Sequence, residues 1–403
     1  MKIIYCHQHF NTRKGFSGTR PYEFAKNLVN SGHEVFVICG NSERAVTGLE
    51  GEFMKGKRQG MVDGINIIEL STPYSNEYGI FRRFVSFIRY AVGASKFTLF
   101  SKHDLVYASS TPLTAGIPGI LSKWVRRKKF VFEVRDLWPE LPIAMGMINN
   151  RLIIYLLSFL EWLCYFSADH IVGLSPGIVE GVKNRGIPKR KISMIPNGCD
   201  IDISISNKVT RPNFIKKEDF LAVYAGAHGV ANGLNAIIEC AVEIKRKKIK
   251  NIKFLLIGEG RMKSSLMQEV KLKKLDDIVF FMKSIHKEDL FSLLSTADIG
   301  LQILQNIEAF YYGTSPNKFF DYITIGLPVM TNYPGWIADM IQEHNIGITC
   351  DPGNAYQFAE ELRLLSLNKD LTKTYGKNSK QLAQSRFNRN LHTKRIIEIL
   401  RSI

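Results

Sequence analysis

Short apolar runs rich in β-branched residues alternate with longer segments of helical periodicity along the chain. In the first half, this pattern predicts strands at residues 3–6, 34–39, 105–108, 129–133, 170–174 and 192–195. Helical segments such as 21–31 and 153–166 separate them. Such alternation predicts an α/β fold in which helices cover both faces of a parallel sheet.

A second series of the same kind begins after residue 215. Its predicted strands are 220–224, 253–257, 278–281, 299–304, 328–331 and 347–349. The polar stretch between the two series contains Pro212 and has no strong periodicity, which is typical of a connection. We therefore expect two Rossmann-like, doubly wound domains, with the first at 1–205, a linker at 206–217, the second at 218–385, and a C-terminal helix at 386–403 that packs back towards the first domain. Because such sheets bind ligands at the carboxyl ends of their strands, we expect the site in a cleft between the domains.

Composition and charge restrict the class of binding partner. The 403 residues include 54 Lys and Arg against 37 Asp and Glu, so the net charge is +17. This charge favours an anionic partner such as a phosphate ester, an acidic membrane surface or nucleic acid, but no recognised nucleic-acid motif accompanies it. The six cysteines show no closely spaced pairs, so the sequence indicates neither a disulfide framework nor a thiolate zinc site and favours a reducing compartment. The first residues are expected to form a strand and not a signal peptide.

No stretch reaches the roughly 20 apolar residues of a membrane-spanning helix. The nearest, residues 152–166, is interrupted by Ser158 and Glu161. We interpret it as a buried core helix, in preference to a membrane contact.

The segment from Gly313 to Tyr322 carries the strongest local signal. Ser315 is a favourable N-cap and Pro316 suits a first helical position, so a short helix is predicted to start at Ser315. Its N-terminus, with Lys318 in the first turn, would bind phosphate. Asp321, one turn further on, shares a face with Asn317 and Lys318 and can accept hydrogen bonds from ribose hydroxyls. The alternative is a capped surface helix with a Lys–Asp pair.

A glycine-rich turn, Gly258-Glu259-Gly260-Arg261, follows the strand predicted at 253–257. Gly258 and Gly260 would let a diphosphate approach the backbone, and Arg261 can pair with its oxygens. Ser264 and Ser265 stand where a dinucleotide fingerprint has its later glycine, so a nicotinamide cofactor is disfavoured.

In the first half, residues 15–21 form a glycine-containing loop after the first strand. Gly15, Gly18 and Arg20 are expected to lie at the cleft, and the alternative is an ordinary βα turn.

The strand predicted at 129–133 runs directly into charged residues. Glu133, Arg135 and Asp136 therefore lie at the carboxyl end of the strand, which is the position of a binding site. Glu133 and Asp136 are therefore candidate site residues. Equally, neighbouring backbone could satisfy them as strand-end residues.

These motifs together resemble the retaining, nucleotide-sugar-dependent glycosyltransferases of family 4, which have the GT-B fold. The resemblance rests, in chain order, on Gly15 to Arg20, Gly32-His33-Glu34-Val35, Arg135 to Glu140, Pro196 to Asp200, Tyr224-Ala225-Gly226, Gly258-Glu259-Gly260 and Ser315 to Tyr322. Within the family, the chain is most similar to bacterial surface-polysaccharide enzymes that use UDP-activated amino sugars, among them N-acetyl-L-fucosaminyl transferases of O-antigen and capsule assembly.

The resemblance implies transfer of a sugar, with retention of configuration and without a metal or other cofactor, from a UDP-sugar to a lipid-linked saccharide on the cytoplasmic membrane leaflet. We expect catalytic roles for Asp136, Glu133 and Arg261, donor binding by Gly258, Gly260, Arg261, Ser315, Asn317, Lys318 and Asp321, and acceptor contacts from Gly15, Gly18, Arg20 and Arg135.

The chain departs from the family pattern at two places. The family usually has two acids eight residues apart, and here Asp321 matches the second while Gly313 occupies the first. The Arg and Lys that often follow Tyr-Ala-Gly are missing from residues 227–233. Stabilisation of the diphosphate would then fall on Arg261, Lys318 and the helix N-terminus.

Basic residues are concentrated between positions 81 and 129, where ten Lys and Arg accompany one acid, Asp104. The segment 81–100 predicts a basic amphipathic helix that, with the cluster Arg126-Arg127-Lys128-Lys129, would bind an anionic membrane surface peripherally. The alternative is a helix packed on its own domain with a solvated basic stripe.

Two other functions stay open at this point. The departures at Gly313, Ala227 and Asn232 are compatible with a non-catalytic, membrane-associated subunit that binds nucleotide sugar or lipid. A GT-B epimerase acting on a UDP-N-acetylhexosamine is the second alternative.

Overall fold

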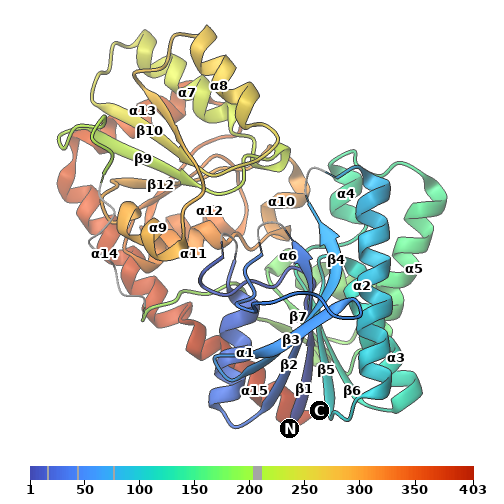
Figure 1. The fold of residues 1–403 in the computed structure, drawn as a ribbon. Coiled ribbons are helices and arrows are strands. Elements are labelled where there is room, and N and C mark those ends of the chain that lie inside the picture. The colour runs from blue at the N-terminus through green and yellow to red at the C-terminus, as the bar shows by residue number, and fades with distance from the viewer. Residues whose placement is uncertain (16–17, 43–44, 76–77, 203–210) are drawn as a thin grey trace. The chain divides into compact units, whose positions relative to one another are not determined.

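The computed structural model describes residues 1–15, 18–42, 45–75, 78–202 and 211–403. It divides into two compact units. Unit 1 consists of Met1–Asn197, Gly313–Ser315 and Arg389–Ile403, and unit 2 consists of Gly198–Tyr312 and Pro316–Asn388 (Figure 1). The first continuous segment of unit 1 ends at Asn197, whereas the boundary was expected at 205. Of the expected linker, residues 206–210 lie outside the described part.

Within its described residues, unit 1 contains an eight-stranded sheet in the order β3-β4-β2-β1-β5-β6-β7-β8. The strands are β1 (Lys2–Cys6), β2 (Glu34–Ser42), β3 (Lys57–Val62), β4 (Ile65–Tyr74), β5 (Leu105–Ser109), β6 (Lys129–Val134), β7 (His170–Gly173) and β8 (Ile192–Met194). Neighbouring strands are parallel except β3 and β4. The predicted parallel sheet is confirmed.

The hairpin of β3 and β4 was not predicted. Val62 pairs with Ile65, and the two residues between them, Asp63 and Gly64, have φ angles of 51° and 80°. An Asp-Gly pair with two positive φ angles is a favoured two-residue hairpin turn. β3 lies at the sheet edge and is largely exposed, so it lacks an apolar run like those of the predicted strands.

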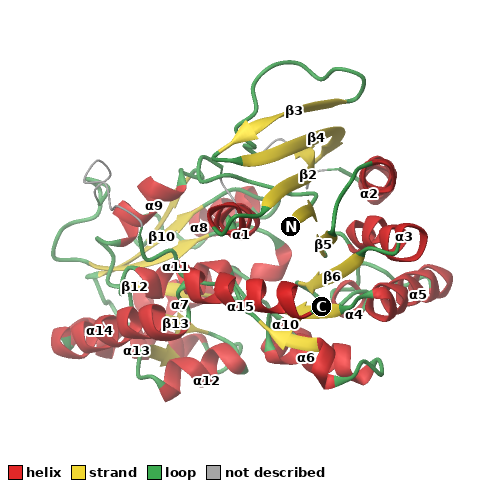
Figure 2. Cartoon of the chain, turned by 90° about the horizontal axis from the view of Figure 1, so that it is seen from below, coloured by secondary structure: helices red, strands yellow, loops and turns green. Residues whose placement is uncertain are grey.

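Helices cover both faces of the unit 1 sheet (Figure 2). They are α1 (Arg20–Asn30), α2 (Ile80–Phe100), α3 (Ile117–Arg126), α4 (Glu140–Ala144), α5 (Arg151–Ser167), α6 (Pro176–Asn184) and α15 (Arg389–Ser402), with 3₁₀ turns at Leu113–Gly116 and Lys189–Lys191. Successive residues of β1 enter different cores: Ile3 packs with α1 and α15, and Ile4 with residues of α2, α3 and α5. This alternation follows from the period of two residues in a strand.

The last helix, α15, contacts α1 and belongs to unit 1. Ile396, Ile397 and Leu400 join the core on that face, and the Asn27 amide donates to Asn390 and Thr393. The C-terminal residues therefore complete one face of the first sheet.

Two helices of unit 1 differ from their predictions. The segment 152–166 was predicted to be a buried core helix, and this is wrong, because α5 buries only Glu161, Cys164, Tyr165 and Ser167. α2 packs with a face of small and polar residues, such as Ala91, Ala94 and Ser95, and leaves Phe84, Val85, Ile88 and Val92 exposed. Among the described helices, none has the length and apolarity that crossing a membrane requires.

Unit 2 contains, in the part that the structure describes, a six-stranded sheet in the order β11-β10-β9-β12-β13-β14. All its paired strands are parallel, as predicted. The strands are β9 (Phe220–Ala225), β10 (Ile252–Ile257), β11 (Val279–Met282), β12 (Ile299–Gln302), β13 (Val329–Thr331) and β14 (Gly347–Thr349). The helices are α7 (Asn235–Arg246), α8 (Lys263–Leu272), α9 (Lys287–Leu294), α10 (Glu308–Gly313), α11 (Asn317–Thr324), α12 (Trp336–Glu343), α13 (Ala355–Leu367) and α14 (Lys369–Arg386), with a 3₁₀ turn at Val230–Asn232.

Candidate functional site

Glu133, at the carboxyl end of β6, is a fully buried partner of Arg20. The Arg20 guanidinium donates to Glu133 Oε2 from Nε at 3.1 Å and from Nη2 at 2.9 Å. The Tyr107 and Ser109 hydroxyls each donate to the same carboxylate at 2.8 Å. Burial alone would raise the pKa of Glu133, but the positive charges of Arg20 and Arg135 outweigh it and hold the pKa below its usual value.

Arg20 is engaged from its other side as well, because it donates to the backbone carbonyls of Ile195 and Pro196. Neither side chain of the pair has any exposed surface. The structure therefore gives Arg20 and Glu133 a structural role in unit 1. It favours the alternative of a satisfied strand-end residue for Glu133 and does not present Arg20 to an acceptor.

Asp136 and Arg135 lie just beyond Glu133 and are half-buried. The Thr111 hydroxyl donates to Asp136 at 3.2 Å, and the Arg135 backbone amide donates to Ser110 Oγ at 2.9 Å. Burial raises the pKa of Asp136, against the opposing effects of Arg135 and Thr111. Of the two predicted catalytic carboxylates in unit 1, Asp136 alone retains access to solvent.

His7 and His9 follow β1 directly and were not assigned a role from the sequence. Burial, reinforced by Arg135, lowers the pKa of both imidazoles, that of His9 to about 4. His7 Nδ1 and the Tyr5 hydroxyl are buried, and neither has a hydrogen-bond partner among the described residues. Both histidines, like Asp136, follow the end of a buried strand. A search for polar residues just after predicted strands, the criterion that identified Asp136, would therefore have identified them too.

Gly15 and Gly18 belong to the loop between β1 and α1, of which residues 16–17 lie outside the described part. A Cβ on Gly15 would lie 2.1 Å from Asn11 Oδ1, which accepts a hydrogen bond from the Val46 amide. The glycine at position 15 is therefore explained by local packing. Gly18 is half-buried.

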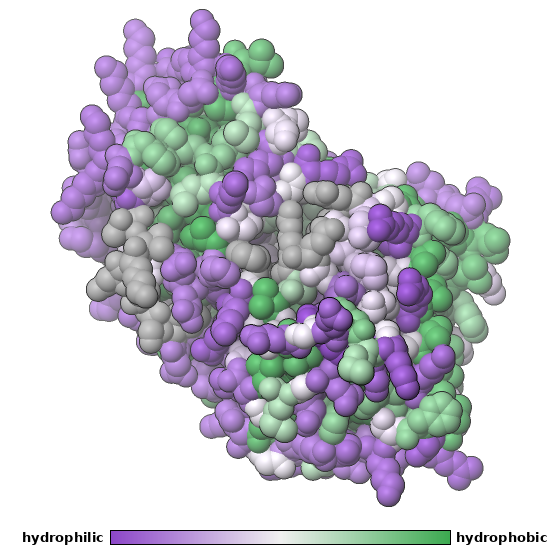
Figure 3. Space-filling view, in the orientation of Figure 1, coloured by the Kyte–Doolittle hydropathy of each residue, from purple (hydrophilic) through white to green (hydrophobic). Residues whose placement is uncertain are grey.

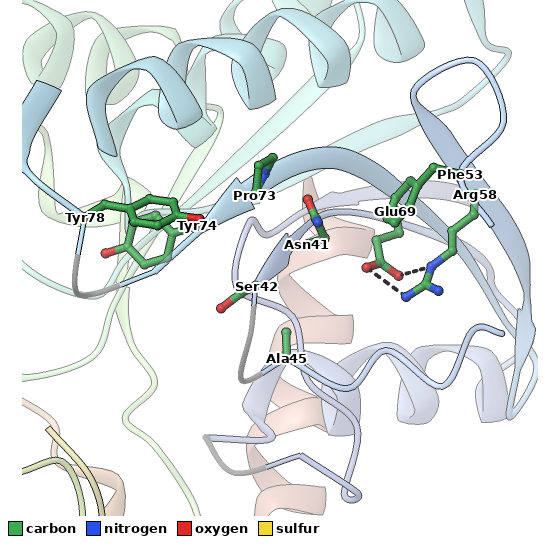
Figure 4. A pocket seen from close by; sticks show the side chains of 9 residues that line it. All are labelled: Asn41, Ser42, Ala45, Phe53, Arg58, Glu69, Pro73, Tyr74 and Tyr78. Atoms are coloured by element: carbon green, nitrogen blue, oxygen red, sulfur yellow. Dashed lines mark hydrogen bonds and ion pairs between the residues drawn. The ribbon is translucent and has the colours of Figure 1, made fainter. Parts of the chain in front are cut away.

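A cavity of about 230 Å³ lies in unit 1 beside β2, β3 and β4 (Figure 4). The Arg58–Glu69 ion pair, 2.9 Å long, forms part of its wall, and Tyr74 and Tyr78 lie further along it. The side chain of Asn41 also lines it. The predicted site residues are not among those that line this cavity.

In unit 2, the turn after β10 packs directly on the turn after β9. A Cβ on Gly258 would lie 1.9 Å from the Gly226 carbonyl oxygen, and one on Gly260 would lie 2.5 Å from the His228 carbonyl oxygen. The His228 amide donates to the Glu259 carbonyl at 3.0 Å. These contacts require glycine at 258 and 260 for packing alone, independently of any ligand.

Arg261 follows this turn and has an exposed side chain. No hydrogen bond or ion pair joins it to any residue that the structure describes. Lys263 is instead engaged, since its ammonium group donates to the carbonyls of Gly258 and Met282 and pairs with Glu259. Arg261 is thus the available cation of the turn.

The helix that was predicted to start at Ser315 begins at Asn317, with Pro316 in the N-cap position. The Ser315 hydroxyl does not cap it, and accepts a hydrogen bond from the Asn197 amide at 3.0 Å. The prediction of Ser315 as N-cap is therefore wrong. Asn317 occupies the first turn of α11 and is half-buried.

Lys318 points towards the turn after β9. Its ammonium group donates to Asn232 Oδ1 at 2.9 Å and lies 4.7 Å from the centre of the Tyr224 ring. A Cβ on Gly226 would be 3.1 Å from Lys318 Cε. Burial lowers the pKa of Lys318 to about 7. Lys318, the Gly226 turn and the Gly258 turn are therefore contiguous.

Asp321 pairs with Lys287 at 3.1 Å, and Lys287 also lies 3.3 Å from Asp200. Lys318 and Asp321 were expected to share one face of the helix. Their side chains have different partners, since Lys318 contacts Asn232 and Asp321 contacts Lys287. A carboxylate has about four acceptor positions, so this pairing is compatible with additional hydroxyl donors.

His228 occupies the segment in which the expected basic residues are missing. Its ring is completely buried, and both ring nitrogens have no partner among the described residues. Burial lowers its pKa to about 4, so the ring is neutral and cannot replace a permanent cation. Its place after β9 could have marked it in the sequence.

Gly313, at the position of the missing acid, ends α10. A Cβ built on it would have nothing within 4 Å. Space therefore does not explain why a glycine stands there. The described residues include no group of three or more His, Cys, Asp or Glu side chains placed to hold a metal ion.

Two family models match the chain in tandem. Glycosyltransferase Family 4 matches residues 17–203, and Glycosyl transferases group 1 matches residues 206–382. One curated relative, N-acetyl-alpha-D-glucosaminyl L-malate synthase of Bacillus anthracis, is 20% identical over 233 residues, which is 55% of this chain and 56% of the relative. The match thus spans little more than half the length of that protein.

Solved structures resemble the whole chain. The Anabaena protein HepE, crystallised in complex with UDP and glucose, superposes with a TM-score of 0.70 at 17% identity, covering 100% of both chains. WaaG, a glycosyltransferase involved in lipopolysaccharide biosynthesis, gives 0.68 at 17% identity, covering 98% of each chain. These similarities confirm the predicted fold. Together with the tandem family matches, they identify the chain as a GT-B glycosyltransferase-type protein with a family 4-type domain followed by a group 1-type domain.

Proposed function

We propose that the protein transfers a sugar from a UDP-sugar to a lipid-linked saccharide, with retention of configuration and without a metal cofactor. The observation that carries this proposal lies in unit 2. There, the turn after β9, the turn after β10 and the first turn of α11 meet at Gly226, Gly258 and Lys318. Arg261 stands beside them, and its guanidinium has no partner among the described residues. Ligands of doubly wound sheets bind at these carboxyl ends.

The two cations at this place, Arg261 and Lys318, suit a departing diphosphate. Arg261 is permanently charged and can pair bidentately with phosphate oxygens. Lys318, with a pKa near 7, becomes fully charged when a diphosphate lies beside it. Fixed cations at the leaving group stabilise the charge that develops there, which is the main task in glycosyl transfer.

Two further groups complete the proposal. Asp321 accepts hydrogen bonds from the ribose while Lys287 fixes its orientation. Asp136, the half-buried carboxylate of unit 1, orients sugar or acceptor. Glu133 and Arg20 support the strand end from behind and do not touch substrate.

The names of similar proteins support the choice of substrates. The relative from Bacillus anthracis is named for an N-acetylated amino sugar, HepE was crystallised with UDP, and WaaG is described as acting in lipopolysaccharide biosynthesis. We propose an N-acetylated amino sugar as the donor sugar and surface-polysaccharide assembly, of O-antigen or capsule, as the process. The positively charged segment 81–129 supports peripheral binding to the anionic cytoplasmic leaflet, through α2 and residues 126–129.

The test is a donor screen in which mass spectrometry follows both UDP release and the mass of a lipid-diphosphate-linked acceptor. The proposal predicts that one UDP-N-acetylhexosamine gives equimolar UDP and an acceptor heavier by one sugar residue. Arg261→Ala should abolish most of this turnover, while Arg246→Ala, an exposed arginine paired with Glu243, should not. Donor consumed without acceptor would indicate an epimerase, and donor bound without UDP release would indicate a binding subunit. Either result refutes the proposal.

A further inference from the structure

Four aromatic side chains stack in a row on the outer surface of unit 1. Phe159, Trp162 and Phe166 of α5 continue to Trp124 of α3, with ring centres 6.0, 5.1 and 6.3 Å apart and interplanar angles of 25°, 12° and 12°. Their exposed fractions are 52%, 42%, 52% and 57%. We call these four residues the aromatic face.

The apolar surface extends beyond the aromatic face. α5 also exposes Leu152, Tyr155 and Leu156, at 66%, 67% and 55%, and α3 exposes Val125 at 62%. Hydrophobic side chains gather over α2, α3 and α5 along one side of unit 1 (Figure 3). Contiguous exposed apolar surface of this kind marks an interaction site.

The packing of unit 1 does not require these side chains. α5 already fixes itself to the core through Cys164 and Tyr165, and a Cβ on Gly116 would lie only 2.5 Å from Cys164 Sγ. The Trp124 indole N–H donates to Ser167 Oγ at 2.9 Å. Because this donor is satisfied inside the protein, the indole can enter an apolar phase without leaving it unpaired.

The exposed charges of α2, α3 and α5 themselves have one sign. The exposed surface of the described α2, α3 and α5 carries no carboxylate, since the acid in these helices, Glu161, is completely buried against Tyr165 and Arg185. Exposed basic residues border the face at Arg126, Arg127 and Arg151. An apolar centre with a basic border complements the acyl and headgroup layers of an anionic bilayer.

We propose that the aromatic face inserts into the interface of an anionic bilayer, so that membrane contact is apolar at its centre and electrostatic at its border. The inference rests on the membrane association in the proposed function and names the surface responsible. A second copy of the chain fits less well, because two basic borders would then face each other and repel. The helices lie in the interface and do not cross it.

The test measures insertion directly. Trp138→Phe and Trp336→Phe leave Trp124 and Trp162 as the remaining tryptophans of the four in the chain. Their fluorescence in this variant should be quenched by vesicles of phosphatidylglycerol and bromine-labelled phosphatidylcholine, but not by the same vesicles without bromine. Absence of quenching while the protein sediments with the vesicles would overturn the proposal, because binding would then be electrostatic without insertion.

Paired variants separate the apolar centre from the border. Phe159→Ser with Trp162→Gln should lower the partition coefficient at 0.5 M salt at least tenfold, whereas Leu272→Gln with Leu367→Gln, exposed at 83% and 69% in unit 2, should leave it unchanged. Equal binding by both pairs would overturn the proposal. So would a concentration-dependent dimer, measured by light scattering, that dissociates in the first pair and does not bind vesicles.

These vesicles contain no donor and no sugar acceptor, so the readout does not depend on turnover. Transfer to a short soluble acceptor without vesicle binding would refute the membrane inference but not the proposed reaction. Vesicle binding without transfer to any acceptor would refute the proposed reaction but not the membrane inference.

Discussion

Replacing Glu133 with Gln tests whether the buried pair with Arg20 supports unit 1 or takes part in chemistry. The substitution keeps the volume but removes a charge that accepts four hydrogen bonds of 2.8–3.1 Å. Arg20 would then be left completely buried without an opposite charge, facing backbone carbonyls and a neutral amide. Breaking a buried ion pair in this way costs about 3–5 kcal/mol.

That cost is a large fraction of the roughly 5–15 kcal/mol that stabilises a domain. Urea unfolding followed by far-UV circular dichroism should show the loss in the transition of unit 1, with the transition of unit 2 unchanged. Glu180→Gln, which removes an exposed pair with Lys183, is the matched control and should cost less than about 1 kcal/mol.

The pH dependence gives a second check. The pKa of Glu133 is lowered in the folded chain, so its stabilisation is present above the unfolded carboxyl pKa of about 4.3 and is lost as the pH falls through the lowered value. The difference between wild type and Glu133→Gln should therefore shrink on acidification below about pH 4. A variant as stable as wild type at pH 7, but with lost turnover, would refute the structural assignment and restore a catalytic one.

Four further predictions concern Arg261, Asp321, Lys318 and Gly313. Arg261→Ala should remove about 2–4 kcal/mol of transition-state stabilisation, measured as kcat/KM, without changing the unfolding free energy, since the side chain is exposed. Asp321→Asn should raise KM for the donor more than it lowers kcat. Wild type should prefer the ordinary donor to a 2′,3′-dideoxyribose donor, and this preference should be weaker in the variant. UDP binding at pH 8 should take up a proton at Lys318, whose pKa is about 7; calorimetry in two buffers measures this, and Lys318→Met should abolish it. Gly313→Glu should change the unfolding free energy by less than about 0.5 kcal/mol, because its Cβ meets open space.

Most of the strands that could be predicted are buried, but β8 and β14 were predicted without a fully buried residue, and the largely buried β4 was missed. β1, β6, β9 and β10 are mainly apolar runs because helices cover both faces of their sheets. β3 escaped prediction because an exposed edge strand needs no such run.

The burial of α2 and α5 could not be predicted from their periodicity. Hydrophobic periodicity indicates that a helix has an apolar face, but not what covers that face. Both helices pack on the sheet with small or polar residues such as Ser86, Ala94 and Cys164 together with one buried tyrosine each, and they leave many of their large apolar side chains exposed. A sequence argument that assumes all large apolar residues point inward therefore misplaces much of their surface.

The sequence could predict that the candidate site residues lie at strand ends, but not which side chains they pair with. Arg135, Asp136 and Arg261 follow buried strands and retain access to solvent. The partners of Glu133 and Asp321 lie far along the chain, at Arg20 and Lys287. No local pattern marks such a pair, because only the fold brings its members together.

A crystal structure of the protein with UDP tests the central claim most directly, namely that unit 2 binds the nucleotide of the donor. The account predicts diphosphate oxygens within hydrogen-bonding distance of the Arg261 guanidinium and the Lys318 ammonium group, and ribose hydroxyls that donate to Asp321. A diphosphate bound away from both cations, or no bound UDP at millimolar concentration, would contradict it.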